Sequence, residues 1–163
     1  MSHKKPQNTE FIKNPLVIIP TRLSSSRLPG KPLADICGVP MIVRVLRQAE
    51  SAKCGPVIVA CCDIEVKNVV EKAGGVAIMT NPNHLSGSDR IYEALQILDP
   101  KESYDAVLNI QGDLPTISPA IPKEALTLLN NEDVDIGTLA TTIVDTSELN
   151  DPNVVKAIVS LNK

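Results

Sequence analysis

The fold is decided by a stretch near the start of the chain, LVIIPTRLSSSRLPGKP, which covers residues 16–32. It opens with Leu16 to Pro20, a short apolar run rich in β-branched side chains. Such a run is typical of a strand buried on both faces, as in a parallel sheet covered by helices. The polar loop from Thr21 to Lys31 then leaves the carboxyl end of that strand, where sheets of this kind bind ligands.

Strand and helix patterns alternate along the rest of the chain. Further strands are predicted at 57–60, 76–79, 106–110, 136–140 and 154–159. Helices are predicted at 41–52, after an Asp63 cap, after a Ser88 cap, and around Ile121, Ala125, Leu128 and Leu129. This order predicts an α/β fold with a mostly parallel sheet and helices on both faces.

Composition narrows the class of protein. Hydrophobic residues make up 43% and charged residues 21% of the 163 residues, as in a soluble globular domain. A net charge of −3 argues against a general nucleic-acid-binding surface. The polar start, Met1 to Asn14, has no apolar core of a signal peptide and is interpreted as a disordered lead to one domain at 15–163.

The four cysteines, Cys37, Cys54, Cys61 and Cys62, form no C-x-x-C pair and have no histidine at metal-ligand spacing. We therefore expect buried thiols in a reducing cytoplasm, and neither a disulfide framework nor a zinc site.

The first loop gathers positive charge. Arg22, Arg27 and Lys31 fall within ten residues that contain no acid, together with three serines and Gly30. A polyphosphate requires such donors, although the pattern fits neither a P-loop nor the dinucleotide fingerprint. A flexible solvated loop matches the composition equally well, and only the position after a buried strand favours a function.

A second loop, Gln111 to Thr116, follows the predicted strand at 106–110 and places Asp113 just beyond the strand end. A carboxylate there suits Mg²⁺, which takes one or two carboxylates plus substrate phosphates. Gln111 offers a donor and an acceptor for a base or a sugar. An isolated Asp of this kind is more often a simple turn residue, so the metal role depends on the cationic loop nearby.

Two smaller signals stay open. The segment from His84 to Arg90 opens a helix, where free amides and hydroxyls would suit a ribose or base, but a plain helix cap explains it equally well. Lys156, within the predicted last strand, would face the crevice or lie at a sheet edge.

Five fragments in this order resemble the motifs of one enzyme family. Their sequences are PTR and SSRLPGKP in the first loop, GVPMI at 38–42, MT with HLSGSDR at 79–90, NIQGDLP at 109–115, and DPNVVK at 151–156. Together they resemble the cytidylyltransferases, most closely those that activate 3-deoxy-D-manno-octulosonate (Kdo). The similarity extends from Leu16 almost to Lys163.

The resemblance implies a Rossmann-like nucleotidyltransferase fold, with three layers, α/β/α. It implies transfer of CMP from CTP to Kdo, with Mg²⁺, for lipopolysaccharide synthesis in the cytoplasm, by an enzyme that is dimeric at full length. Arg22, Arg27 and Lys31 would be catalytic and Asp113 would bind the metal. The residues that would contact substrate are Pro20, Thr21, Ser26, Gly87, Ser88 and Gln111.

Some positions depart from the family pattern. Thr21 replaces Ala, Ser26 replaces Thr, Cys61-Cys62 replace Thr-Asp, and Leu114 replaces a Glu beside Asp113. Family members are also longer, so we expect a truncated domain that lacks a second metal-binding Asp, most of the sugar site and the dimer region. A synthetase for CMP-sialate and a catalytically inactive nucleotide-binding relic are the alternative readings.

Overall fold

The computed structural model describes residues 12–24 and 28–160. The strands are β1 (Pro15–Pro20), β2 (Asp35–Ile36), β3 (Val39–Pro40), β4 (Val57–Cys61), β5 (Val76–Met79) and β6 (Ala106–Asn109). The helices are α1 (Met41–Ala52), α2 (Ile64–Lys72), α3 (Gly87–Leu98), α4 (Ala120–Thr127) and α5 (Ser147–Asn150), with 3-10 turns η1 (Lys31–Leu33) and η2 (Leu128–Asn130). None of these helices is long and apolar enough to cross a bilayer.

The main sheet has four parallel strands in the order β5-β4-β1-β6. Val17 of β1 lies opposite Val57 on one side and Leu108 on the other. Because the chain adds β4 and β5 on one side of β1 and then β6 on the other, the strand order reverses at β1. Such a reversal opens a crevice beyond the carboxyl ends of the strands.

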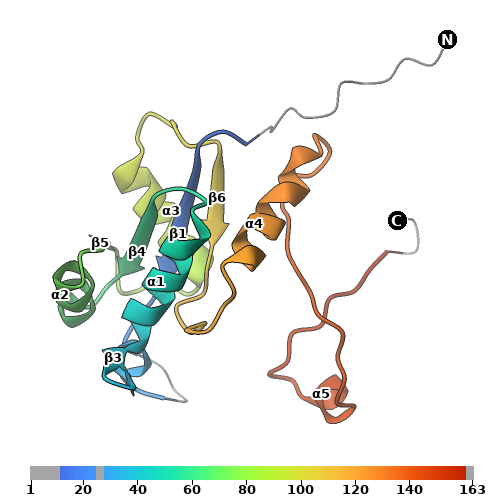
Figure 1. The fold of residues 1–163 in the computed structure, drawn as a ribbon, viewed down its shortest axis with the longest axis horizontal. Coiled ribbons are helices and arrows are strands. Elements are labelled where there is room, and N and C mark those ends of the chain that lie inside the picture. The colour runs from blue at the N-terminus through green and yellow to red at the C-terminus, as the bar shows by residue number, and fades with distance from the viewer. Residues whose placement is uncertain (1–11, 25–27, 161–163) are drawn as a thin grey trace.

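The central strand β1 is buried on both faces, which explains its continuous apolar run. Val17 and Ile19 pack into the hydrophobic cluster under α1 and α2, whereas Leu16 and Ile18 pack into the cluster under α3. All four side chains are fully buried. Figure 1 shows α1 on one face of the sheet and α3 on the other. The predicted three-layer α/β/α fold is therefore confirmed.

Helix α1 covers its face of the sheet with an apolar stripe at helical spacing. Ile42, Val45, Leu46 and Ala49 are fully buried, while Arg47 on the opposite side is exposed. Each large aliphatic side chain buried in this way contributes about 1.5–3 kcal/mol to stability. The helix bounds are those predicted from the sequence.

The predicted strands at 57–60, 76–79 and 106–110 are confirmed to within one residue. A short antiparallel hairpin of β2 and β3 was not predicted, because two-residue strands carry no periodicity. The predicted Ser88 cap is wrong: α3 begins directly after Ser86.

The two strands predicted at 136–140 and 154–159 are also wrong, since neither segment is in a strand. A strand needs a neighbour for its backbone hydrogen bonds, and after α4 the chain runs away from the sheet (Figure 1). Ile136 is 89% exposed and Val155 and Ile158 are 95% exposed.

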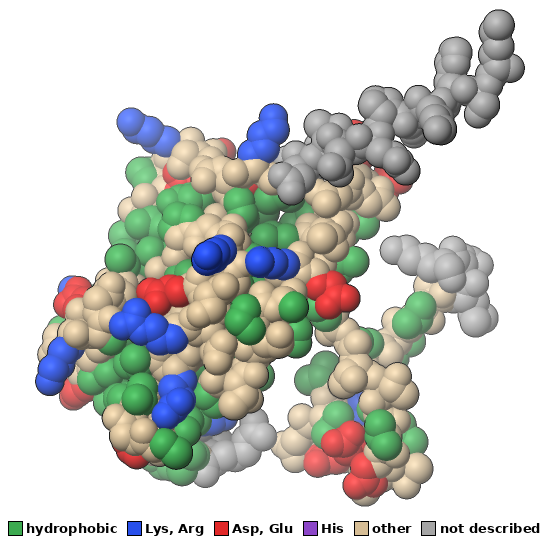
Figure 2. Space-filling view, in the orientation of Figure 1, with side chains coloured by type: hydrophobic (Ala, Val, Ile, Leu, Met, Phe, Trp, Pro, Cys, Tyr) green, Lys and Arg blue, Asp and Glu red, His purple; other side chains and the backbone are tan. Residues whose placement is uncertain are grey.

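Lys156 therefore lies in no strand, and its Nζ donates to the carbonyl of Asp151. Figure 2 shows acidic and hydrophobic side chains together at the surface around α5.

Candidate functional site

A cavity of about 830 Å³ opens beyond the carboxyl ends of β1, β5 and β6. Its walls come from the loops that follow these strands and from the first turn of α3. The residues that line it are Pro20, Thr21, Arg22, Ser24, Pro29, Lys31, Pro32, His84, Ser86, Gly87, Arg90, Gln111, Gly112 and Asp113. We refer to this cavity as the main pocket; it lies where the reversal of strand order at β1 predicts a crevice.

An ion pair joins the two loops that the sequence singles out. Lys31 Nζ lies 2.7 Å from Asp113 Oδ2, and the two side chains are 34% and 50% exposed. Lys31 opens the turn η1, which follows Gly30 in the left-handed region at φ 72°. A residue with a Cβ adopts that conformation only with strain. The turn directs the ammonium group of Lys31 across the pocket to the carboxylate of Asp113.

The loop after β6 also lies close against the end of β1. A Cβ added at Gly112 would stand 2.9 Å from the carbonyl oxygen of Pro20 and 3.2 Å from Cβ of Thr21. Only glycine permits this approach, which places Asp113 beside the cationic loop. The amide of Thr21 donates to the carbonyl of Ala60 at 2.9 Å, and this bond fixes the backbone of Thr21 beside the end of β4.

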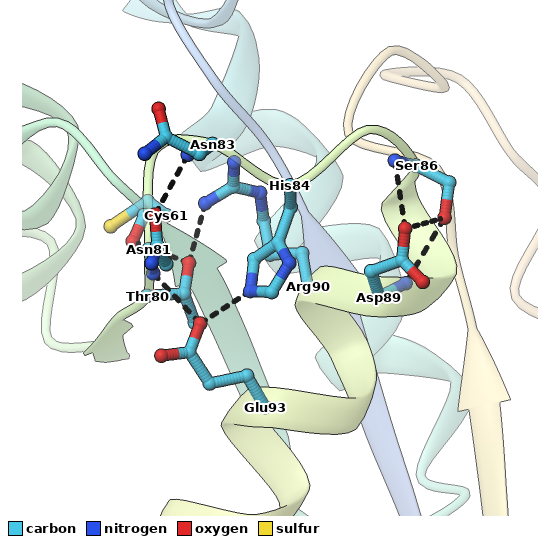
Figure 3. Close-up of polar contacts among 9 residues, drawn as sticks. All are labelled: Cys61, Thr80, Asn81, Asn83, His84, Ser86, Asp89, Arg90 and Glu93. Carbon is cyan, nitrogen blue, oxygen red and sulfur yellow. Dashed lines mark hydrogen bonds and ion pairs between the residues drawn. The ribbon is translucent and has the colours of Figure 1, made fainter.

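The third wall of the pocket is the loop between β5 and α3 (Figure 3). Ser86 caps α3: its Oγ accepts from the amide of Asp89, and the Asp89 carboxylate accepts from the amide of Ser86. This reciprocal capping box fixes the direction of the first turn. The S-x-x-D spacing in the sequence is the signal that would have identified Ser86 as the cap.

Arg90 is the most deeply buried charge at the pocket. Its side chain is 2% exposed, and Nη1 donates to Thr80 Oγ1 at 2.5 Å. Thr80 Oγ1 in turn donates to the carbonyl of Cys61 at 3.0 Å. The second nitrogen, Nη2, has no hydrogen-bond partner among the described residues. A buried donor of this kind that borders a cavity is available to an acceptor from a ligand or from ordered water.

A second polar pair secures the same loop. Glu93 Oε2 lies 2.5 Å from His84 Nε2 and accepts from the amide of Asn81 at 2.7 Å (Figure 3). The Asn81 amide and the His84 side chain together lower the pKa of Glu93. His84 lines the pocket, so Glu93 holds a pocket residue from the second turn of α3.

The cysteines do not form a reactive centre. All four are free thiols, and burial raises the pKa of Cys61 to about 11. Burial is also the main cause that raises the pKa of Cys62. Cys37, however, is exposed and Cys54 and Cys62 are partly exposed, so the prediction of buried thiols is confirmed for Cys61 alone. No cluster of three metal-ligating side chains occurs in residues 12–24 and 28–160.

The main pocket brings together seven of the residues predicted for the site: Pro20, Thr21, Arg22, Lys31, Gly87, Gln111 and Asp113. Ser88 is exposed and does not line it. Ser26 and Arg27 lie outside the described residues. His84, Ser86 and Arg90 line the pocket but were not among the predicted site residues, because each is equally compatible with an ordinary helix start.

A family model described as cytidylyltransferase matches residues 16–163 of the chain. A relative named 3-deoxy-manno-octulosonate cytidylyltransferase, from Rhodospirillum centenum, is 54% identical over 149 residues, which are 91% of this chain and 58% of that protein. The protein of the same name from Paramagnetospirillum magneticum is 50% identical over 90% of this chain and 60% of its own length. The chain thus spans about three fifths of the length of these curated relatives.

Solved structures show the same similarity. A CMP:2-keto-3-deoxy-manno-octonic acid synthetase in complex with CTP superposes with a TM-score of 0.66 at 38% identity, over 75% of this chain and 49% of that chain. A cytidylyltransferase from Leptospira borgpetersenii superposes with a TM-score of 0.63 at 22% identity, over 73% of this chain and 50% of that chain, which shows a shared fold. From the family match and these relatives, we conclude that the chain belongs to the cytidylyltransferase family.

Proposed function

We propose that this chain forms the nucleotide site of an enzyme that transfers CMP from CTP to 3-deoxy-D-manno-octulosonate. The product, CMP-Kdo, would supply lipopolysaccharide synthesis in the cytoplasm. The observation that carries the proposal is the ion pair between Lys31 and Asp113, because it unites the cationic loop and the lone acid in one pocket. The names of the relatives and the CTP complex of a similar structure support the choice of nucleotide and sugar.

In this reaction the anomeric hydroxyl of Kdo attacks the α-phosphorus of CTP. A new oxygen–phosphorus bond forms, the bond from the α-phosphorus to the bridging oxygen of the β-phosphate breaks, the hydroxyl proton passes to water, and pyrophosphate leaves. Arg22 and Lys31 line the pocket and would bind the triphosphate and neutralise the charge that grows on the leaving group. Positioning and charge stabilisation are most of what such a transfer needs.

Asp113 would hold Mg²⁺ in the same pocket. Its carboxylate is half exposed, and among the described residues it is the only acid that lines the cavity. This donor set fits a magnesium ion that takes its other ligands from phosphate oxygens and water. When bound, the ion would neutralise phosphate charge, and Lys31 would be freed from Asp113 to contact the nucleotide.

Arg90 would contribute a donor that is already desolvated. Its buried Nη2 lacks a partner within the described chain, and a carbonyl oxygen of the cytosine ring or a ribose hydroxyl would satisfy it. Because the guanidinium is held by Thr80 in advance, little ordering cost would accompany the contact.

A nucleotide-binding module without turnover is the second candidate, favoured because Asp113 alone among the described residues brings a carboxylate to the pocket. The two candidates are distinguished by measuring whether this chain releases pyrophosphate from CTP when Kdo or sialate is supplied as the acceptor. The proposed enzyme releases pyrophosphate with Kdo, and Lys31→Ala and Asp113→Asn both abolish the release. Saturable CTP binding without pyrophosphate release would instead support the module, and release only with sialate would assign the other sugar.

A further inference from the structure

Asp63 stands at the N-cap of α2 but does not cap the helix. Its backbone is extended, at φ −112° and ψ 125°, as an N-cap requires, and its carbonyl accepts the first helical bond, from the Lys67 amide at 3.1 Å. Its side chain makes no capping bond to α2. An Asp at this position usually uses its carboxylate for that bond, so the carboxylate of Asp63 serves another purpose.

The carboxylate instead holds the start of the cationic loop. Asp63 Oδ2 accepts from the amide of Leu23 at 2.8 Å, forty residues away in the sequence, in a partly buried position. The same oxygen accepts a weaker bond from the Cys62 thiol at 3.3 Å. One step earlier, the amide of Thr21 donates to the Ala60 carbonyl. The backbone carbonyls of β4 accept hydrogen bonds from β1 up to Thr21. Where the backbone then turns away into α2, the side chain of Asp63 provides the next acceptor.

Leu23 is the fixed base of the loop. Its amide is bound by Asp63, its carbonyl accepts from the Gly30 amide at 3.0 Å, and its side chain packs against the core cluster. The residues on either side of it, Arg22 and Ser24, both line the main pocket. A residue that is held at its amide, its carbonyl and its side chain thus lies between two pocket residues.

We infer that Asp63 is a positioning residue, whose carboxylate holds Leu23 so that Arg22 and Ser24 face the nucleotide. Asp63 itself does not line the pocket, so it acts through Leu23 and not by contact. The inference deepens the proposed function and rests on CTP binding in the main pocket.

If Asp63 acted only through its negative charge, its removal would strengthen CTP binding, because a carboxylate near a phosphate site repels the phosphates. Both Asp63→Asn and Asp63→Ala would then bind CTP more tightly than wild type. A positioning role depends on an acceptor for the Leu23 amide, which asparagine retains and alanine lacks. The pair of variants therefore separates the two roles.

The test measures CTP binding by titration calorimetry and the exchange of the Leu23 amide by NMR in the 163-residue chain. We expect Asp63→Ala to weaken CTP binding about tenfold and to expose the Leu23 amide to exchange, and Asp63→Asn to restore both to near wild type. The matched control is Asp105→Ala, because Asp105 accepts from the amides of Lys13 and Asn14 at the opposite end of the sheet. That variant should leave both readouts unchanged.

The result that overturns the inference is an Asp63→Ala variant with wild-type CTP affinity, or with a protected Leu23 amide. Equal weakening in Asp63→Asn and Asp63→Ala would also overturn it, since asparagine still offers the acceptor. If the wild-type chain is folded and binds no CTP, the proposed function fails, and with it the positioning of a nucleotide. If, in that case, Asp63→Ala still exposes the Leu23 amide to exchange, Asp63 stabilises the loop without any role in nucleotide binding.

Discussion

At the scale of single residues, the pocket depends on three close contacts. Gly112 approaches the Pro20 carbonyl, Lys31 reaches Asp113 across the opening, and Arg90 is buried with one nitrogen unpaired within the described chain. The chemistry of these groups is visible in the sequence, whereas their distances are not.

The first prediction concerns Gly112→Ala. Its Cβ would meet a backbone carbonyl at 2.9 Å, and backbone atoms move only at a cost, so we expect a loss of about 1–3 kcal/mol in the free energy of unfolding. Gly87→Ala is the comparison, because its nearest atom is Cγ of Pro20 at 3.3 Å and the ring can adjust. Urea unfolding measures both. Equal stabilities of the two variants would show that the approach at Gly112 is not tight.

The second prediction separates binding from stability at Arg90. Replacement by methionine removes a buried charge and its unpaired nitrogen, a change that is often neutral or stabilising. We expect Arg90→Met to keep its melting temperature within a few degrees, while CTP affinity falls about tenfold or more. Thermal unfolding and calorimetry measure these two effects. Wild-type CTP affinity in a folded Arg90→Met variant would show that Arg90 does not contribute to CTP binding.

At the scale of elements, α3 organises one wall of the pocket through its first two turns. Asp89 closes the capping box with Ser86, Arg90 binds Thr80, and Glu93 binds His84 and the Asn81 amide (Figure 3). The helix is thus tied at three successive points to the loop that precedes it. A change in the ionisation of one of these groups should alter the stability of that wall.

The third prediction follows from the lowered pKa of Glu93. A carboxylate with a lower pKa in the folded state stabilises the fold above its unfolded pKa, and this contribution is lost as the pH falls through the folded value. The stability difference between wild type and Glu93→Gln should therefore be present at pH 6 and shrink as the pH falls below about 4.3. Urea unfolding across this range tests the effect, with the exposed Glu124→Gln as control. A difference that does not change with pH would contradict the account.

At the scale of the whole molecule, the sequence predicted the sheet, its helices and the end of the sheet that carries the pocket. It did so because β1 is a continuous apolar run and because buried residues recur at helical spacing in α1. It failed for the segments at 136–140 and 154–159, whose composition suits strands but which have no neighbour to pair with. The role of Asp63 was not predictable, because its partner Leu23 lies forty residues away in the sequence. The role of Arg90 was not predictable either, because its burial and its unpaired nitrogen arise only when α3 packs against the end of the sheet.

The most direct test of the central claim is calorimetric titration of CTP into this chain, with and without Mg²⁺, beside Lys31→Ala, Asp113→Ala and the surface control Lys72→Ala. We predict saturable binding that Mg²⁺ strengthens, a loss of about tenfold or more in Lys31→Ala, and no further effect of Mg²⁺ in Asp113→Ala. Lys72→Ala should bind as wild type does. A folded chain that binds no CTP, or one whose binding is unchanged in Lys31→Ala, would contradict the assignment of the nucleotide to the main pocket.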